Sequence, residues 1–391
     1  MSELIDVKQE QAGCFTRKIA SNYITSLKLF NFRNYKFYRA DFCQYPTAFI
    51  GKNGVGKTNI LEAISLMQPG RGIRSVKLED LSYKYNGNFG VHINLLKNNE
   101  NFEIGSFLDA TVSGVRKVKI DGNSISPLLL TEYMGIISLT PLMDKIFIEG
   151  ASNRRKFFDK IVWIFISMHA KNTRLYEKSI KERNNLLKEN SKESIWFDNV
   201  EKQIVRYGTQ IIIDRFQVLK LLNDQINNNA KFPKASMLFV GEVEDIYNKS
   251  KDINFFKESF LKELHERRAK DFYRGITTIG PHKTDLEVRY KEKDMIARLC
   301  STGEQKSLLI SIILAVAKSY KEFTKLSPIL LLDEVFSHLD NDKKESLSKE
   351  IENLNSQAFM TGIDESDFMT FNKDSCIINL DNLNNRRSNE Y

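Results

Sequence analysis

One stretch of the chain has the residue types and spacing of a phosphate-binding loop. The segment GKNGVGKT fits the pattern G-x-x-x-x-G-K-[ST] and follows the short apolar run Ala48–Ile50. Its glycines let backbone N–H groups turn toward a phosphate chain, its lysine would bridge the β- and γ-phosphates, and its threonine would offer a hydroxyl to Mg²⁺. The sequence therefore predicts a nucleoside triphosphate site with ATP and Mg²⁺ as cofactors, rather than a glycine-rich turn without a ligand. The predicted nucleotide-binding residues are Gly51, Lys52, Asn53, Gly54, Val55, Gly56, Lys57 and Thr58.

A second group with phosphate chemistry ends the apolar run Pro328–Leu332. Asp333 and Glu334 follow this run directly. We expect Asp333 to bind Mg²⁺ beside Thr58, and Glu334 to act as the catalytic residue that orients and polarises the attacking water. Phosphoryl transfer depends on such positioning and charge neutralisation more than on covalent chemistry. The plainer alternative is a strand capped by two acids at the start of a helix.

A third group precedes a helical apolar pattern at Glu304–Tyr320. It consists of Ser301, Thr302, Gly303, Glu304 and Gln305. Ser301 and Glu304 have capping-box spacing, so these residues could serve only to start the helix. Further along, Asp340 closes the short segment that follows Glu334.

Three regions of different character must position these groups. Residues 23–150 contain strand patterns and one helix, and we expect a polar, disordered extension at residues 1–22 before them. Residues 151–270 are highly charged with apolar residues at helical spacing, which predicts an inserted α-helical lobe. Residues 271–391 alternate strands and helices. The predicted fold class is therefore α/β, a mixed β sheet with helices plus an inserted helical lobe.

The bulk properties narrow the class of protein only slightly. The net charge is +8 and the pI is about 9.0, which suits a polyanionic partner such as nucleic acid. Lysine is frequent throughout the chain, however, so the charge alone does not define a binding patch. No apolar run approaches the length of a membrane span, and the four cysteines are widely separated, which favours a cytoplasmic protein with reduced thiols.

Together, these motifs resemble those of a known family. The Ser301–Gln305 segment ahead of the LLLDE strand resembles the signature of ABC-type ATPases, and the residues up to Asp340 resemble their D-loop. Three further stretches look like RecF motifs and extend the resemblance from about Tyr23 to Leu380: Leu27–Tyr35, Ala151–Asp159 and Gly280–Leu286. RecF proteins are bacterial recombination-repair ATPases related to the heads of SMC and Rad50 proteins.

The resemblance implies a fold, partners and a role. The fold would be an ABC-type ATPase head, and ATP would be sandwiched between two copies, with the signature of one copy facing the P-loop of the other. Such a dimer would bind DNA at gaps or at junctions of single and double strands. It would act with RecO and RecR to help RecA load, supporting repair, replication and the SOS response.

Some residues depart from the family pattern or have uncertain roles. Lys283-Thr284 stands where the family usually has Arg-Asp, and no glutamine occurs in 138–149, where Asp144 or Glu149 could replace the nucleotide-sensing residue. Transporter ATPases have a switch histidine after the strand that ends at Thr361, and this chain has none there. This difference predicts weak, slow hydrolysis. The basic candidates could be ordinary surface residues or functional ones: Arg71 and Arg74 as DNA-sensing residues, Arg33 near the nucleotide, and Arg154 with Arg155 as the family's paired arginines.

Three other functions are compatible with parts of the pattern. A membrane transporter's ATPase subunit would share the P-loop and signature, but it would have the switch histidine and lack the inserted helices. A long-armed SMC or Rad50 protein would need hundreds of heptad residues in place of 153–270. A small-molecule kinase would need no signature motif.

Overall fold

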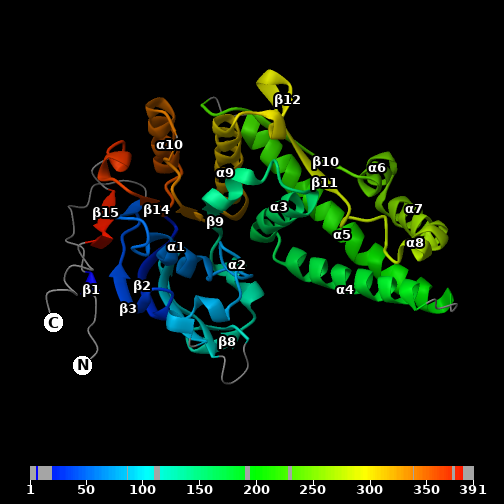
Figure 1. Ribbon diagram of the computed structural model, residues 1–391, viewed down its shortest axis with the longest axis horizontal. Helices are drawn as coiled ribbons and strands as arrows, with labels where there is room; N and C mark the ends of the chain where they lie inside the picture. The colour runs from blue at the N-terminus through cyan, green and yellow to red at the C-terminus, as the bar shows by residue number, and fades with distance from the viewer. Residues whose placement is uncertain are drawn as a thin grey trace. The chain divides into compact units, whose positions relative to one another are not determined.

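The computed structural model divides into two compact units (Figure 1). Unit 1 contains residues 1–144 and 313–391, and unit 2 contains residues 145–312. The structure describes residues 6–7, 20–85, 87–109, 115–189, 194–227, 231–337, 339–371 and 375–381. The expected extension at 1–22 lies largely outside these ranges, but strand β1 (Asp6–Val7) falls within it and pairs with β3.

A five-stranded parallel sheet in unit 1 carries the phosphate-binding loop. Its strand order is β15-β4-β14-β13-β9. Because parallel strands end at the same edge of a sheet, the segments that follow β4, β13, β14 and β15 lie close together there. The five strands are β4 (Thr47–Ile50), β9 (Ile136–Leu139), β13 (Ile329–Leu332), β14 (Ala358–Gly362) and β15 (Cys376–Asn379).

A seven-stranded sheet forms the other half of unit 1, in the order β1-β3-β2-β5-β6-β7-β8. All its pairs are antiparallel except β1 with β3. Alternate residues of β2, β5 and β7 are buried, so one face of this sheet packs on the core. Its other strands, after β1, are β2 (Asn22–Phe32), β3 (Tyr35–Asp41), β5 (Asn88–Lys97), β6 (Glu100–Asp109), β7 (Lys117–Ile120) and β8 (Asn123–Ile125).

One hydrophobic core joins the two sheets of unit 1 through helix α1 (Lys57–Ser65). Ile60 and Ile64 of this helix belong to the same buried cluster as Ile93 of β5 and Phe359 of β14. The helix that begins at the phosphate-binding loop is therefore fixed from both sides. The remaining α-helices of this unit are α2 (Leu130–Tyr133), α10 (Asn341–Asn353) and the C-terminal part of α9.

Unit 2 is mostly helical and includes a small sheet in the order β10-β11-β12. Its helices are α3 (Ala151–Phe165), α4 (Met168–Lys188), α5 (Ser194–Asn227), α6 (Glu242–Lys249), α7 (Ile253–Glu266) and α8 (Arg268–Arg274). Its strands are β10 (Ala235–Val240), β11 (Asp285–Tyr290) and β12 (Met295–Ile296). Helix α9 (Thr302–Thr324) begins in this unit and crosses the division at Ile312.

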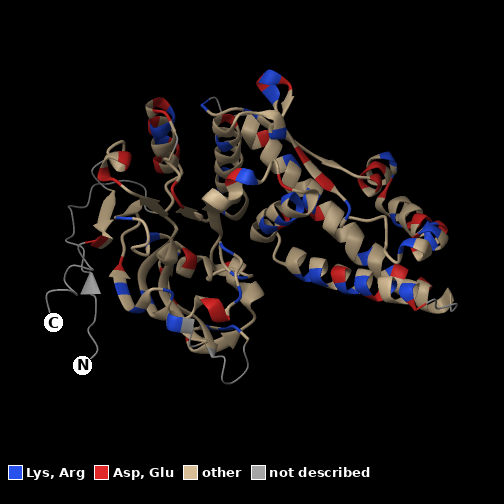
Figure 2. Cartoon of the chain, in the orientation of Figure 1, with Lys and Arg blue, Asp and Glu red and all other residues tan. Residues whose placement is uncertain are grey.

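The charged helices of unit 2 are not only solvated surfaces. Lys and Arg alternate with Asp and Glu along α4 (Figure 2), yet Arg183 of this helix has no exposed surface. Its guanidinium donates to Glu201 at 2.9 Å and to Asp271 at 2.7 Å. Arg215 of α5 forms a two-bond pair with Asp159 of α3, with both distances 2.8 Å. These buried pairs tie α3, α4 and α5 to one another and to α8.

The division of the chain differs from the expected one. The helical lobe was expected at 151–270, but unit 2 extends from Lys145 to Ile312 and includes β10–β12 and the signature segment. Strand β10 lies inside the range 151–270, where only helices were expected. Among the described residues, no helix combines the length and apolarity needed to cross a bilayer.

Candidate functional site

The phosphate-binding loop has the backbone that its glycines allow. Gly51, Gly54 and Gly56 have φ values of 141°, 84° and 111°. A side chain on Gly56 would come within 2.6 Å of the Tyr35 hydroxyl, so both its φ and its surroundings require glycine. Among the described residues no side chain caps the N-terminus of α1, so the amides of its first turn can face an anion.

Lys57 lies at the start of α1 with only 5% of its surface exposed. Its ammonium group donates to the carbonyl oxygens of Gly51 and Lys52, which folds the side chain back over the loop. Burial lowers the pKa of Lys57, against the opposing attraction of Glu334, Asp381 and Asp333. The loop thus holds one cation where a phosphate chain would need it.

The predicted metal ligands lie next to each other. The Thr58 hydroxyl donates to Asp333 Oδ1 at 2.9 Å, and the Thr361 hydroxyl donates to the same oxygen at 2.7 Å. Thr361 comes from β14, which lies between the strands that end at Thr58's loop and at Asp333. A hydroxyl and a carboxylate are the hard oxygen ligands that Mg²⁺ prefers, so these residues fit the ion.

Glu334 has an unusual backbone conformation. Its φ is 50°, in the left-handed region that non-glycine residues rarely adopt. Its N–H donates to the Thr361 hydroxyl at 2.9 Å, and its carbonyl accepts from the Ser337 N–H at 3.1 Å. Thr361 therefore fixes both members of the Asp333–Glu334 pair through one hydroxyl. In the sequence, Thr361 was notable only because no histidine follows it.

Asp381, which follows β15, completes this edge of the sheet. Its carboxylate accepts from the Lys52 N–H, at 3.0 Å to Oδ2 and 3.3 Å to Oδ1. The parallel pairing of β15 with β4 brings it there, because Asn379 lies opposite Ile50. Asp381 and Tyr35 were both missed from sequence, since neither belongs to a motif that marks them as part of a nucleotide site.

The signature segment starts α9 in unit 2 with a reciprocal cap. The Ser301 N–H and hydroxyl both donate to Glu304 Oε2, at 2.8 and 2.9 Å. The ion pair with Lys293 and these donors lower the pKa of Glu304 to about 2. Gln305 is buried and donates to the Cys300 carbonyl at 2.9 Å.

Three residues of the signature segment are exposed on their own chain. Ser301, Thr302 and Gly303 are exposed, and a Cβ on Gly303 would meet nothing within 4 Å. The φ of Gly303 is not in the left-handed region either. Neither the packing nor the backbone of the described chain requires glycine at this position.

The remaining predicted residues of unit 1 have local partners. Asp340 caps α10 by accepting from the Lys343 N–H at 2.8 Å, and His338 of the same segment lies outside the described residues. Arg71 is exposed, whereas Arg74 lies 3.5 Å from the buried carboxylate of Glu62.

Arg33 has a fixed position in the structure. It donates two hydrogen bonds to Glu62 of α1, at 2.8 and 2.9 Å. Its guanidinium therefore anchors the turn between β2 and β3 to the helix that follows the phosphate-binding loop.

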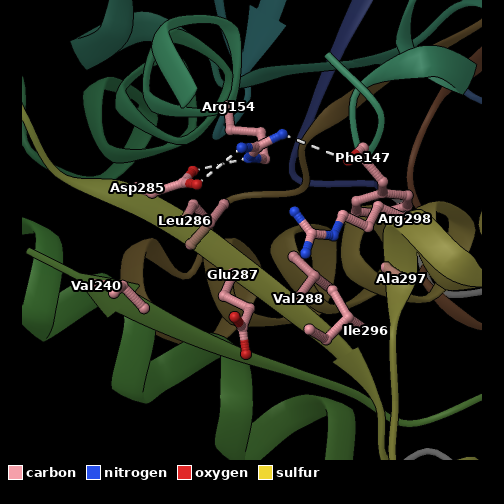
Figure 3. A pocket seen from close by; sticks show the side chains of 10 residues that line it. All are labelled: Phe147, Arg154, Val240, Asp285, Leu286, Glu287, Val288, Ile296, Ala297 and Arg298. Atoms are coloured by element: carbon pink, nitrogen blue, oxygen red, sulfur yellow. Dashed lines mark hydrogen bonds and ion pairs between the residues drawn. The ribbon is translucent and has the colours of Figure 1, made fainter. Parts of the chain in front are cut away.

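The first motif in unit 2, Ala151–Asp159, and the second, Gly280–Leu286, meet at a small cavity of about 110 Å³ (Figure 3). Arg154 donates two bonds of 2.8 Å to Asp285, and Arg155 donates to the Thr284 carbonyl at 2.6 Å. Arg298, just before the signature segment, extends toward the same cavity. The arginines of the Ala151–Asp159 motif thus pair with the second motif through Asp285.

His282 of the second motif has a partner that sequence reasoning did not find. Its Nδ1 accepts from the Tyr176 hydroxyl at 2.7 Å, and its Nε2 donates to the Thr277 carbonyl at 3.1 Å. Burial lowers the pKa of His282 to about 4. The neutral ring therefore connects α4 to the loop before β11.

Comparison of the sequence with models of protein families gives a match over most of the chain. Residues 23–383 match the model described as RecF/RecN/SMC N terminal domain. The head domain of Smc from Pyrococcus furiosus, 17% identical over 90% of this chain and 92% of its own, has a TM-score of 0.50 and shares the fold. The fold and the site thus define an ABC-type ATPase head of the kind found in RecF and SMC proteins.

Curated relatives and solved structures narrow the class further. The DNA replication and repair protein RecF of Brucella suis biovar 1 is 38% identical over 91% of this chain and 94% of its own length. That of Rickettsia bellii is 37% identical over 92% and 99%. A structure of the recombination mediator protein RecF with ATP, in the RecFOR pathway, is 25% identical over 90% and 96%, with a TM-score of 0.79. The chain belongs to the RecF family of DNA replication and repair proteins.

Proposed function

We propose that this chain binds ATP with Mg²⁺ and closes into a homodimer that clamps DNA at gaps or single-strand/double-strand junctions. In the dimer, Ser301–Gln305 of one copy face the nucleotide on Gly51–Thr58 of the other. Slow hydrolysis of ATP reopens the dimer and releases the DNA. In the cell this clamp acts with RecR and RecO and helps RecA load, in support of replication, repair and the SOS response.

The observation that carries the proposal is the contrast between a half-site whose glycine the fold requires and an exposed half-site whose glycine it does not require. The P-loop residues, Asp333 and Thr361 contact one another within unit 1. Ser301, Thr302 and Gly303 are exposed on the described chain, and nothing in it explains the glycine. A phosphate group held by a second copy would need both the hydroxyls and the close backbone approach that glycine allows.

The residues of the site divide the chemistry among them. Lys57 and the first-turn amides of α1 bind the phosphates, and Thr58 with Asp333 would hold Mg²⁺, which neutralises charge on the β- and γ-phosphates when bound. Glu334 orients the attacking water, and Thr361 keeps Glu334 in position through its bond to the backbone N–H. No histidine follows Thr361 in the sequence, and we expect hydrolysis to be weak for this reason and to serve as a timer.

DNA recognition in this proposal depends on backbone and shape rather than on sequence. The net charge of +8 suits contacts to phosphates, and Arg71 and Arg74 are candidate DNA-sensing residues after α1. Binding to duplex should weaken steeply with salt, with a log–log slope of about −0.9 for each phosphate neutralised. The relatives' names, which refer to DNA replication and repair, support this partner.

The proposal is tested by sizing the Glu334→Gln variant with ATP, Mg²⁺ and a gapped duplex. Because the variant cannot orient the attacking water, closed dimers should accumulate on the DNA and elute as a dimeric complex. The matched control is Glu365→Gln, which changes an exposed carboxylate after β14 and should behave as the unchanged chain does. A Glu334→Gln protein that stays monomeric with ATP and DNA would contradict the clamp.

A further inference from the structure

The outer face of the seven-stranded sheet carries a row of aromatic side chains interrupted by a glycine. Gly90 of β5 pairs with Phe30 of β2 on one side and with Phe107 of β6 on the other. Phe37 of β3 lies opposite Phe30, with 5.1 Å between the ring centroids in an edge-on arrangement. Phe30 is 48% exposed although it lies in the middle of a sheet face, so its ring is available to a partner.

A second row, two residues along each strand, is basic. Its three cations are Arg39, Lys28 and Lys119, on β3, β2 and β7, and His92 of β5 and Gly105 of β6 lie between Lys28 and Lys119. Burial lowers the pKa of His92, and the Glu103 carboxylate lies 3.9 Å from its ring. The Lys119 ammonium lies 5.9 Å from the centre of the Phe107 ring. Because residues on one strand face the same side at intervals of two, the rows run parallel about 7 Å apart.

The two glycines make a hollow in this face. The cavity has a volume of about 320 Å³ and is lined by Phe30, Gly90, His92, Glu103, Gly105, Phe107 and Lys119, among others. The strands that carry Phe30 and Phe107 are two strand spacings apart, about 10 Å, and a planar ring with van der Waals separations of about 3.5 Å on each side fits there. A side chain on Gly90 would make ordinary contacts of 3.7 Å or more with Phe30, and its φ is not left-handed. The hollow is therefore not a requirement of the fold.

We propose that this face binds single-stranded nucleic acid, with bases stacked on Phe30, Phe37 and Phe107 over Gly90 and with phosphates along the basic row. Exposed aromatic rings beside cations are the combination that holds single strands without reading their sequence. The rows differ in chemistry as bases and phosphates do, which favours a nucleic acid over an apolar protein partner. The inference rests on the proposed function, in which a junction offers a single-stranded arm, and it assigns that arm to a surface distinct from the ATP site.

The test measures the binding of a fluorescent 20-nucleotide oligothymidine, and of an abasic strand of equal length, to the full chain by anisotropy. The Gly90→Val variant fills the hollow but should not harm folding, because valine suits a strand better than glycine does. The oligothymidine should bind Gly90→Val about 5- to 140-fold more weakly, as expected from the loss of one stacked base at about 1–3 kcal/mol. The abasic strand should bind both proteins equally and more weakly than oligothymidine binds the unchanged chain.

Two further variants make the result specific. Phe107→Trp should retain the oligothymidine affinity, and its added fluorescence should be quenched when the strand binds. Phe255→Ala, which removes an exposed phenylalanine from α7 of unit 2, should leave the affinity unchanged. The proposal is overturned if the abasic strand binds as tightly as oligothymidine, or if Gly90→Val binds normally.

Two other results would also overturn the proposal or separate it from the ATP clamp. A change in the sedimentation of Gly90→Val without nucleic acid would identify the face as a contact between copies of the chain instead. If Gly90→Val loses oligothymidine but its Glu334→Gln form still accumulates as a dimer on a gapped duplex with ATP, the two sites are separate, as proposed. If the ATP-driven dimer never forms while Gly90→Val still weakens oligothymidine binding, only the clamp fails.

Discussion

The phosphate-binding loop and the start of α9 both carry glycines and hydroxyl groups, but their surroundings differ. Gly56 is buried against Tyr35, and Lys57 and Thr58 bond to groups of their own unit. At α9, Gly303 meets nothing within 4 Å, and Thr302 is exposed. The chain's own fold explains a glycine such as Gly56, which packing requires. A glycine such as Gly303, which the fold does not require, indicates a contact with another molecule. The comparison therefore separates the half-site that holds the nucleotide from the half-site that we propose for closing over it.

The largest difference should appear when one polar group is changed in each half. Lys57→Ala should weaken ATP binding to the isolated chain by about 10- to 150-fold, because it removes a charged hydrogen-bond donor. Ser301→Arg should leave this binding unchanged but abolish ATP-driven dimerisation. Calorimetry measures ATP binding and size-exclusion chromatography measures dimerisation, with Lys202→Ala, at an exposed position of α5, as the control. If Ser301→Arg also lost nucleotide in the monomer, the assignment of the two halves would be wrong.

The glycines give a test that does not depend on ATP. Gly56→Ala should lower the free energy of unfolding by about 1–3 kcal/mol, because its Cβ would meet the Tyr35 hydroxyl. Gly54→Ala shares the positive φ but has no such neighbour, so it isolates the backbone contribution. Gly303→Ala should be neutral or up to about 1 kcal/mol stabilising in a helix. Urea unfolding measures all three, and a destabilised Gly303→Ala would show that the fold does require this glycine.

A smaller effect is expected at Asp381. Its carboxylate lies against the Lys52 N–H, where it would repel the phosphates of a nucleotide. Asp381→Asn should therefore tighten ATP binding about fivefold, corresponding to about 1 kcal/mol between charges at close range in water. The exposed Asp364→Asn serves as the control in the same calorimetric titration. Unchanged or weaker binding would mean that Asp381 supports the loop rather than opposing the nucleotide.

The smallest effect concerns pH at the start of α9. The ion pair with Lys293 and the donors of Ser301 depress the pKa of Glu304 to about 2 in the folded chain. Its stabilising effect is present above the ordinary glutamate pKa of about 4.5 and is lost as the pH falls toward 2. Carbon-detected NMR should show the carboxyl titrating near pH 2, and Lys293→Gln should move the midpoint upward. Lys291→Gln, on the same turn, should not.

Much of the site could be predicted from sequence because its parts are contiguous. Gly51–Thr58, Asp333–Glu334 and Ser301–Glu304 each combine residue types at fixed spacing, and the capping box of Ser301 and Glu304 is present. The ABC-type head fold was also predictable, since it follows from the order of these motifs and the strand patterns between them. Family membership then confirmed this fold.

Contacts through tertiary structure could not be predicted in this way. Asp381 reaches the loop only because β15 pairs with β4, and nothing in its local sequence marks it. Thr361 bonds to both Asp333 and Glu334 because β14 pairs directly with β13, the strand that ends just before them. Arg183 sits among charges at helical spacing, a pattern that usually indicates a solvated face, yet it is buried with carboxylates from distant segments. Sequence periodicity shows which residues share a helix face but not what that face meets.

At Glu334, stability and the proposed function favour different residues. Glycine there would relieve the strain of a φ of 50° that the glutamate side chain imposes. It would also remove the carboxylate that we propose to orient water. Random substitution followed by selection for thermostability alone should therefore enrich glycine at 334, and selection for nucleotide turnover should restore glutamate. The residue that limits the stability of this loop would then be the same one that, in the proposed clamp, sets how long DNA is held.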